Sequence, residues 1–329
     1  MRVLAVLVTA LLPALAAESA AGGPYAVRVR PTEATVAWVV EQSGGLQARH
    51  KTLTNLKPGA VTKYEADGVQ AGFKTPPQGR AAYRFVVFGD TRTRADMHRR
   101  VVSAILKASP DFVIHTGDLV ANGASVAQWR EFFDIENELL RRAAFFPVPG
   151  NHERNDRQYF DFFVMTKPYY SFDWGQAHFT MLDTDFGAAG GEGFWKEQAR
   201  WLDGDLAGSA GADFRFVIMH HPPITAIKRR QGNQNLLRLV PILEKHKVTA
   251  VFAGHDHNYQ RHLKNGIQYI VTGGGGAPLY DLDEGIPGVT QKLEKTEHFV
   301  AVRVDGKDAR IEALALDGRV LDTAGLEAK

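Results

Sequence analysis

Short apolar runs alternate with amphipathic stretches from Tyr83 to the end of this 329-residue chain, and this alternation restricts the fold more than any other feature. The runs include YRFVVFG, DFVIHTG, AAFFPVPG and FRFVIMH, and each ends in glycine or at His220. Between them lie amphipathic stretches such as RADMHRRVVSAILKAS and SVAQWREFFDIENELLRR. Alternating strands and helices predict an α/β domain with a largely buried sheet, which we assign to residues 83–324.

Antiparallel hairpins are expected at two places in the same domain. The segment YYSFDWGQAHFTMLD has the pattern of a hairpin within the same sheet system. The C-terminal segment HFVAVRVDGKDARIEALALDGRVLD carries two Asp-Gly pairs between alternating runs, which predicts antiparallel hairpins.

Two further segments precede this domain. Residues 23–76 alternate apolar and polar residues between Pro and Gly punctuation, which predicts a small β-sandwich. Residues 1–16 have one early Arg, a short apolar core and the sequence Ala-Leu-Ala, the pattern of a secretory signal peptide. A buried N-terminal helix and a membrane anchor are the alternatives. We expect a periplasmic or secreted protein whose mature form has no membrane span, because no second long apolar run follows.

The composition limits the chemistry. The chain has no cysteine, which excludes disulfides, zinc-thiolate sites and Cys nucleophiles. A net charge of +2 is too mild to indicate nucleic-acid or membrane binding, although small anionic ligands remain possible. Any bound metal must therefore be held by His, Asp, Asn or Glu, a donor set that suits Zn, Mn or Fe.

Metal-competent side chains follow five of the expected strands. In open α/β sheets functional groups collect at the carboxyl ends of strands, so these side chains should lie at one edge. A single such side chain is weak evidence for a metal site, since a lone Asp after Gly is usually a turn residue. Side chains of this kind after five strands together indicate a metal site. His255 and His257 are two residues apart, so an extended backbone would direct both toward one target. The candidates are Asp90, Asp118, Asn151, His152, His220, His221, His255 and His257.

The ordered motif GD…GD…GNHE…HH…GHDH resembles that of the calcineurin-like metallophosphoesterases. The preceding TVAW, LTNLKPG and GFKTPP segments look like an abbreviated fibronectin-III-like domain of the purple acid phosphatase branch, and GHDHNYQR is similar to exported bacterial members of it. The resemblance implies a four-layer α/β/β/α sandwich. It also implies two divalent or trivalent transition metals (Fe, Mn or Zn) and a small phosphorylated substrate.

The resemblance assigns roles to individual residues. Asp90, Asp118 and His257 would hold one metal, and Asp118 would bridge to a second metal held by Asn151, His220 and His255. We choose His220 over His221 as the ligand because it directly follows the strand FVIM. His152 would act as general acid or phosphate-binding group. We also expect Arg92, His221 and Tyr259 to bind substrate, with an Arg92 that turns outward to a surface carboxylate as the alternative.

Two positions depart from the family pattern. Members often carry His two residues after the first Asp, where this chain has Arg92, which cannot coordinate a cation. The purple branch carries Tyr three residues after the bridging Asp, where this chain has Ala121. These departures leave three protein ligands for the first metal and no basis for an iron–phenolate site.

The sequence thus predicts a metallophosphoesterase in which metal-activated water attacks phosphorus directly. A phosphomonoesterase is favoured. The alternatives are a phosphodiesterase acting on nucleotides or lipid head groups, and a non-catalytic protein that binds phosphorylated ligands through a degenerate metal site.

Overall fold

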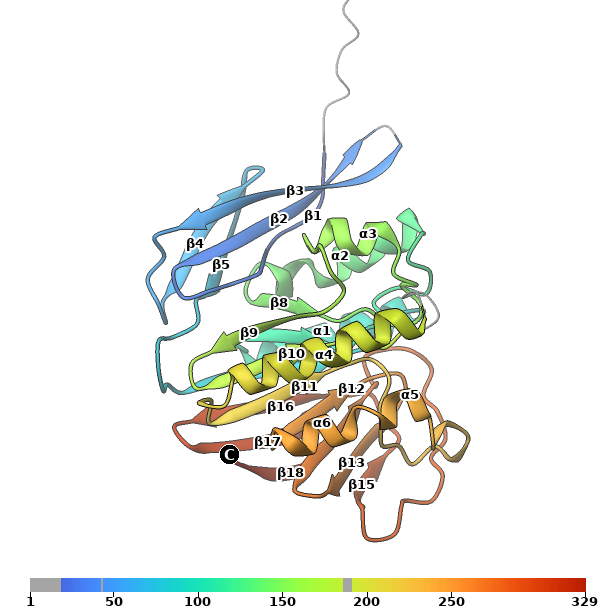
Figure 1. Ribbon diagram of the computed structural model, residues 1–329. Coiled ribbons are helices and arrows are strands. Elements are labelled where there is room, and N and C mark those ends of the chain that lie inside the picture. Colours follow the sequence, from blue (N-terminus) through green and yellow to red (C-terminus); the bar gives the residue numbers. More distant parts are fainter. Residues whose placement is uncertain (1–18, 43, 186–190) are drawn as a thin grey trace, which may run out of the picture.

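Two β-sheets form the centre of the molecule in the computed structural model, which describes residues 19–42, 44–185 and 191–329 (Figure 1). The expected signal peptide lies outside these residues. The first sheet contains β6 (Tyr83–Phe88), β7 (Phe112–His115), β8 (Ala144–Pro147), β16 (His298–Asp305), β17 (Asp308–Ala315) and β18 (Val320–Glu327). The second contains β9 (Tyr170–Trp174), β10 (Ala177–Met181), β11 (Phe214–Ile218), β12 (Ala250–Ala253), β13 (Tyr259–Lys264), β14 (Ile267–Thr272) and β15 (Thr290–Glu294).

The parallel strands form one half of the first sheet and the middle of the second. The first sheet runs β18-β17-β16-β6-β7-β8, with β6, β7 and β8 parallel. The second runs β15-β13-β14-β12-β11-β10-β9, with β10, β11, β12 and β14 parallel. The predicted hairpins are confirmed, because β9 pairs with β10, and β16, β17 and β18 pair in turn, all antiparallel.

Aromatic side chains from the facing sides of the two sheets form the main core. Phe85 of the first sheet lies edge-on to Phe179 and Phe216 of the second, at ring-centroid distances of 5.2 and 5.6 Å. Such contacts hold the two sheets face to face.

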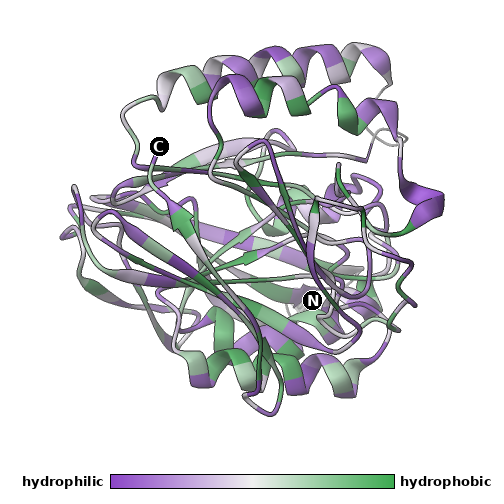
Figure 2. Cartoon of the chain, turned by 90° about the horizontal axis from the view of Figure 1, so that it is seen from below, coloured by the Kyte–Doolittle hydropathy of each residue, from purple (hydrophilic) through white to green (hydrophobic). Residues whose placement is uncertain are grey.

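Helices cover the two outer faces (Figure 2). Against the first sheet lie α1 (Ala95–Ala108), α2 (Val126–Leu140) and α3 (Arg157–Phe162), which share an apolar cluster with Phe88 and Val113. Against the second lie α4 (Glu192–Gly208) and α6 (Val240–Lys245), packed on Val217 and Val251. The shorter η1 (Lys228–Arg230) and α5 (Gln234–Leu237) precede α6. The predicted four-layer α/β/β/α sandwich is confirmed.

The N-terminal segment is built of five strands. The antiparallel sheet of β1 (Ser19–Val27), β2 (Glu33–Gln42) and β3 (Gly45–Thr54) is followed by the hairpin of β4 (Val61–Ala66) and β5 (Val69–Lys74). The Tyr25 ring stacks on Phe133 of α2 at 5.6 Å, and its hydroxyl donates to the carbonyl of Phe162 at 2.7 Å. The N-terminal sheet therefore packs directly on the helices of the larger domain. None of the helices in the described part of the chain is long and apolar enough to cross a membrane.

Candidate metal centre

The loops that follow parallel strands of both sheets meet at one edge of the molecule. Asp90 follows β6, Asp118 follows β7, and Asn151 and His152 follow β8. His220 follows β11, and the segment with His255 and His257 follows β12. The structure brings these side chains together, as the strand-end pattern predicts, and their side-chain donor atoms form two adjacent groups.

The first group, here called the His220 cluster, consists of His220, His255, Asn151 and one oxygen of Asp118. The Nε2 atom of His220 lies 3.0 Å from Asn151 Oδ1, 3.3 Å from His255 Nδ1 and 3.4 Å from Asp118 Oδ1. His220 is fully buried, and its other nitrogen, Nδ1, donates to the carbonyl oxygen of Thr116 at 2.8 Å. With Nδ1 as the donor, Nε2 is the ring nitrogen that can coordinate an ion.

The donor chemistry of the His220 cluster fits a transition-metal ion. The Nε2 atom of His220 faces the amide oxygen of Asn151 at 3.0 Å and a carboxylate oxygen of Asp118 at 3.4 Å, and electron-rich acceptors at such distances repel one another. A cation held between them converts that repulsion into coordination, and His, Asn and Asp donors suit Zn, Mn or Fe. The backbone bond of His220 Nδ1 fixes the ring in the orientation that such a ligand needs.

The second group, the His257 cluster, consists of Asp90, Asp118 and His257, whose candidate ligand atoms lie within 4.8 Å of one another. His257 Nδ1 donates to the carbonyl of Pro278 at 2.7 Å, so the lone pair of its Nε2 faces Asp90 Oδ1 at 3.3 Å. Asp90 Oδ1 is buried and has no hydrogen-bond partner, whereas Oδ2 accepts from the backbone of His255 at 2.9 Å.

Asp118 lies between the two clusters. Its Oδ1 faces His220 and accepts from the backbone N–H of His152 at 3.0 Å. Its Oδ2 accepts at 3.1 Å from Arg92, whose guanidinium also lies 3.4 Å from His257 Nε2. Burial alone would raise the pKa of Asp118, but His220, His152 and Arg92 together outweigh burial and lower it. The carboxylate is therefore ionised and has one oxygen for each cluster.

The backbone between β12 and β13 corrects one expectation. His255 adopts a left-handed conformation with φ of 67°, so the chain turns there instead of continuing extended. His255 consequently lies with His220, while His257 lies with Asp90 and Asp118. The two histidines do not reach one common target.

His221 lies beside the His220 cluster. Its ring centroid is 4.2 Å from that of His255, and its Nδ1 lies 3.0 Å from the hydroxyl of Thr184. Burial, together with the neighbouring His220, lowers the pKa of His221 to about 3, so this imidazole is neutral. His220, His221 and His255 all lie close enough to share an ion. A substrate-binding role for His221 stays a prediction.

His152 faces the open side of the site with about a third of its side chain exposed. Its Nδ1 donates to the carbonyl of Ala121 at 2.8 Å, and its Nε2 lies 3.9 Å from Asp118 Oδ2. The free Nε2 is thus oriented toward the carboxylate that lies between the clusters. This position is compatible with either predicted role, general acid or phosphate contact.

The structure corrects the expectation for Tyr259. This residue is fully buried in the core between the sheets, and its hydroxyl donates to Asp322 at 2.9 Å, so it does not line the mouth of the site. The side chain points inward because alternate residues of β13 face opposite sides of the sheet. Tyr280 lies at the site instead, with its ring stacked on His257 at a centroid distance of 4.0 Å.

Glu153, the last residue of GNHE, supports the site although it was not predicted as a site residue. Its buried carboxylate accepts from the backbone N–H groups of Asp118 at 2.9 Å, Gly150 at 2.7 Å and Val120 at 3.1 Å. These three bonds tie the loop after β7 to the loop after β8. Glu153 therefore sets the distance between Asp118 and Asn151, and no periodicity in the sequence indicates this.

Asp256 and the basic segment η1 (Lys228–Arg230), which follows β11, form a second support. Asp256 is fully buried between the two site histidines, where it accepts from Arg230, Thr225 and Gln260. Arg230 also donates to the carbonyl of His255 at 2.9 Å and lies over the ring of Tyr280 at 5.0 Å. This arginine of the basic segment thus holds the loop that carries His255 and His257.

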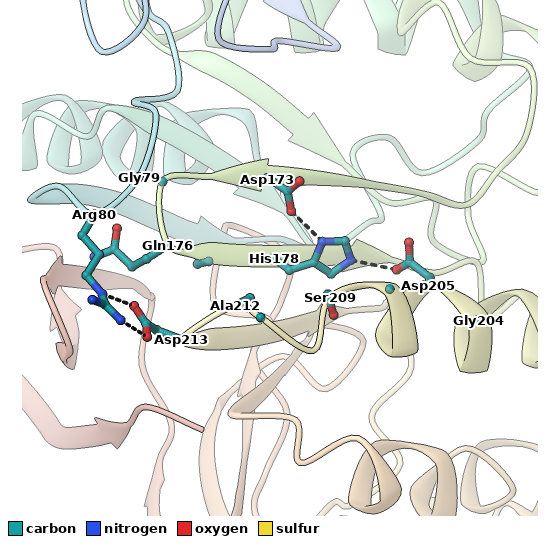
Figure 3. Close-up of a pocket in the computed structure, with 14 residues that line it drawn as sticks. Gly79, Arg80, Asp173, Gln176, His178, Gly204, Asp205, Ser209, Ala212 and Asp213 are labelled. Atoms are coloured by element: carbon teal, nitrogen blue, oxygen red, sulfur yellow. Dashed lines mark hydrogen bonds and ion pairs between the residues drawn. The ribbon is translucent and has the colours of Figure 1, made fainter.

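A separate cavity of about 640 Å³ lies at the amino ends of β10 and β11, away from the carboxyl ends that lead to the candidate metal centre (Figure 3). Its lining includes Ala177 and Asp213, at the amino ends of these strands, whereas His220 follows the carboxyl end of β11. His178 lies between two carboxylates there, 2.7 Å from Asp173 and 2.9 Å from Asp205. This cavity is not part of the metal centre.

A double-sheet α/β core that gathers carboxylate, amide and imidazole donors at one edge defines a metal-binding protein of the α/β/β/α class. The family model described as calcineurin-like phosphoesterase matches residues 83–259, more than half of the chain, and the protein belongs to that family.

Relatives of known sequence or structure agree with this membership. An uncharacterized protein of Mycobacterium tuberculosis is 27% identical over 268 residues, 66% of this chain and 51% of that protein. Purple acid phosphatase 21 of Arabidopsis thaliana is 28% identical over 258 residues, 69% of this chain and 58% of its own length. The chain thus spans little more than half the length of these curated relatives.

The fold is similar to that of a purple acid phosphatase from yellow lupin (Lupinus luteus) seeds. The two structures superpose with a TM-score of 0.74 at 17% identity, over 92% of this chain and 74% of the lupin chain. At this identity the similarity concerns the fold.

Proposed function

We propose that the chain is a metal-dependent phosphoesterase that hydrolyses phosphate monoesters. The observation that carries the proposal is that the lone-pair donors of Asn151, His255 and Asp118 all lie close to His220 Nε2. Asp118 also presents its second oxygen to the other cluster. Family membership and the similarity to purple acid phosphatases support the same reaction class.

Each part of the site has a role in this reaction. Asp118, Asn151, His220 and His255 would hold the metal. The bound metal would act as a Lewis acid on the phosphoryl group and on a water nucleophile. His152 Nδ1 donates to the Ala121 carbonyl, so Nε2 carries a proton only in the imidazolium form. In that form it would donate to a phosphate oxygen or give its proton to the leaving alcohol, which returns the ring to neutrality. We propose that the bound metal is Fe, Mn or Zn, which suit His, Asn and Asp donors.

Charge favours monoesters over diesters. A monoester at neutral pH carries more negative charge than a diester, and this site presents the guanidinium of Arg92 beside Asp118 in addition to any metal. Charge-assisted contacts are stronger with the more highly charged ligand.

Hydrolysis of nitrophenyl phosphate and of bis-nitrophenyl phosphate, after addition of Mn, Zn or Fe, tests the proposal. We expect metal-dependent turnover with a higher kcat/KM for the monoester. A higher kcat/KM for the diester would replace the monoesterase by a phosphodiesterase. Phosphate binding without turnover under any metal would contradict the enzyme and favour a phosphate-binding protein.

We further propose that the protein is exported, on the signal-peptide pattern of residues 1–16. Cell fractionation and N-terminal sequencing of the expressed protein test this. A cytoplasmic protein that keeps its first residues would contradict it.

A further inference from the structure

The guanidinium of Arg92 lies inside the His257 cluster. Its Nε donates to Asp118 Oδ2 at 3.1 Å, and its terminal NH2 group lies 3.4 Å from His257 Nε2. The Arg92 side chain is 14% exposed and its carboxylate partner is 1% exposed. This pair is therefore enclosed in the site and is not a solvated surface ion pair.

The acceptors that Arg92 contacts are the same lone pairs that a metal ion would need. His257 Nδ1 is occupied by the carbonyl of Pro278, so Nε2 is the only ring nitrogen that can accept from Arg92 or coordinate an ion. Asp118 Oδ2 is likewise the carboxylate oxygen turned toward this cluster. The single lone pair of His257 Nε2 cannot serve a guanidinium and a metal ion at once, and the two cations would repel each other across Asp118 Oδ2.

The remaining donor keeps the cluster partly open to a cation. Asp90 Oδ1 is buried without a partner and faces His257 Nε2 at 3.3 Å. Ala121 has no side-chain donor to add to the cluster. With Arg92 in place, one of the three candidate ligand atoms is free, and without it all three are free.

We propose that Arg92 is a built-in cation that competes with metal for the His257 cluster, so that the chain binds one ion tightly, in the His220 cluster. The inference rests on the proposed function for the presence of that ion. Arg92 contributes the positive charge that a second ion would otherwise supply, and its N–H groups are available to the phosphate oxygens.

Metal stoichiometry tests the inference without reference to turnover. The apoprotein is equilibrated with Zn²⁺ or Mn²⁺, excess metal is removed, and metal per chain is measured by elemental analysis, with affinities from titration calorimetry. We expect about one tightly bound ion in the wild type and about two in Arg92→Ala, with the second ion binding at least about tenfold more tightly than in the wild type.

Three variants make the result specific. Arg92→Gln removes the charge but keeps much of the side chain, and should also gain an ion if Arg92→Ala is poorly folded. The double variant Arg92→Ala/Asp90→Asn should return to about one ion, which locates the gained ion at the His257 cluster. Arg99→Gln is the matched control, since Arg99 lies on the exposed face of α1 and pairs with Asp134.

Each outcome decides something. Two equally tight ions in the wild type, or no gain in both folded Arg92 variants, would overturn the competition. Absence of tightly bound metal in the wild type and all variants would contradict the proposed function itself. A gain that survives Asp90→Asn would place the second ion elsewhere and would also overturn the inference.

Discussion

Three of the proposed ligand residues have backbone conformations that residues other than glycine rarely adopt. Asp90, Asp118 and His255 have φ values of 59°, 57° and 67°, in the left-handed region. Each such residue costs about 1–2 kcal/mol relative to an ordinary conformation, so three together at one site are a sizeable expense of folding energy. The sharp turns place these side chains across the strand ends instead of along them.

The His220 cluster leads to the first prediction. His255→Ala removes one ligand, and we expect metal content to fall and turnover to drop by about 10²–10⁴, the loss of a few kcal/mol of transition-state stabilisation. Elemental analysis and hydrolysis of nitrophenyl phosphate measure the two effects. His50→Ala, on an exposed position of β3, is the matched control. Full activity with unchanged metal content would remove His255 from the site.

His152 carries the second prediction. If its free Nε2 protonates the leaving alcohol, His152→Ala should lower kcat for alkyl phosphates more than for nitrophenyl phosphate, whose leaving group needs little protonation. Bound metal should stay in place, because the His152 side chain is not among the proposed ligands. An equal loss on both substrates would assign His152 to phosphate binding.

At the scale of the elements, the loops between strands fit each other closely. A Cβ atom on Gly150 would meet the backbone nitrogen and Oδ1 of Asp118. The loop after β8 can approach the loop after β7 only because this side chain is missing. Glu153 then locks the approach through its three backbone bonds.

Gly150→Ala should therefore push Asp118 out of place. We expect a lower melting temperature and reduced metal content, read by differential scanning calorimetry and elemental analysis. Gly204→Ala is the control, because Gly204 lies within α4 with open space around it. That change should stabilise the protein by about 0.5–1 kcal/mol through helix propensity. Normal metal content in Gly150→Ala would contradict the close fit.

The β9–β10 hairpin contains a pH-sensitive contact. Burial alone would lower the pKa of His178, but hydrogen bonds to Asp173 and Asp205 outweigh it and raise this pKa to about 9. Because the folded pKa lies above the unfolded value of about 6.5, the stabilisation is complete below about pH 6.5 and is lost as the pH rises through about 9.

Urea unfolding at a series of pH values measures this effect. Between pH 6.5 and 10 the wild type should lose on the order of 2 kcal/mol more stability than His178→Asn, which has no proton to release. Parallel stability curves for the two proteins would show that His178 is not charged in the fold.

At the scale of the whole molecule, the N-terminal strands and the larger domain share their apolar clusters. Ala26, Val36 and Phe73 belong to the cluster between the two sheets, and Tyr25 and Val39 belong to the cluster around α2. This continuity indicates one cooperative unit, although residues 23–76 form a separate segment of the sequence.

Tyr25 tests that continuity. Tyr25→Ala should lower the free energy of unfolding by about 3–5 kcal/mol, because a large buried ring that packs on Phe133 is lost. Tyr25→Phe should cost only about 1 kcal/mol, for the bond to the Phe162 carbonyl. Calorimetry should show a single transition that shifts as a whole. Two transitions, with only one displaced, would indicate independently stable domains.

The pattern of apolar runs was sufficient for the α/β class and for a group of neighbouring candidate ligands, and the four-layer α/β/β/α arrangement followed from the resemblance to the calcineurin-like metallophosphoesterases. Apolar runs that end in glycine mark the ends of strands. The carboxyl ends of parallel strands meet at one edge of a sheet, and this does not depend on which other residues pack nearby. Asp90, Asp118, Asn151, His220, His255 and His257 could therefore be predicted as neighbours. The role of each as a ligand remains a prediction that the variants above test.

Only the tertiary structure decided how these neighbours divide and which other residues join them. The left-handed turn at His255 separates it from His257, and alternation along β13 turns Tyr259 into the core. Arg92 turns inward because Asp118 and His257, which lie 26 and 165 residues away in the chain, present acceptors to it. Local pattern determines where a strand ends, but the direction of a side chain beyond that end depends on partners that are distant in sequence.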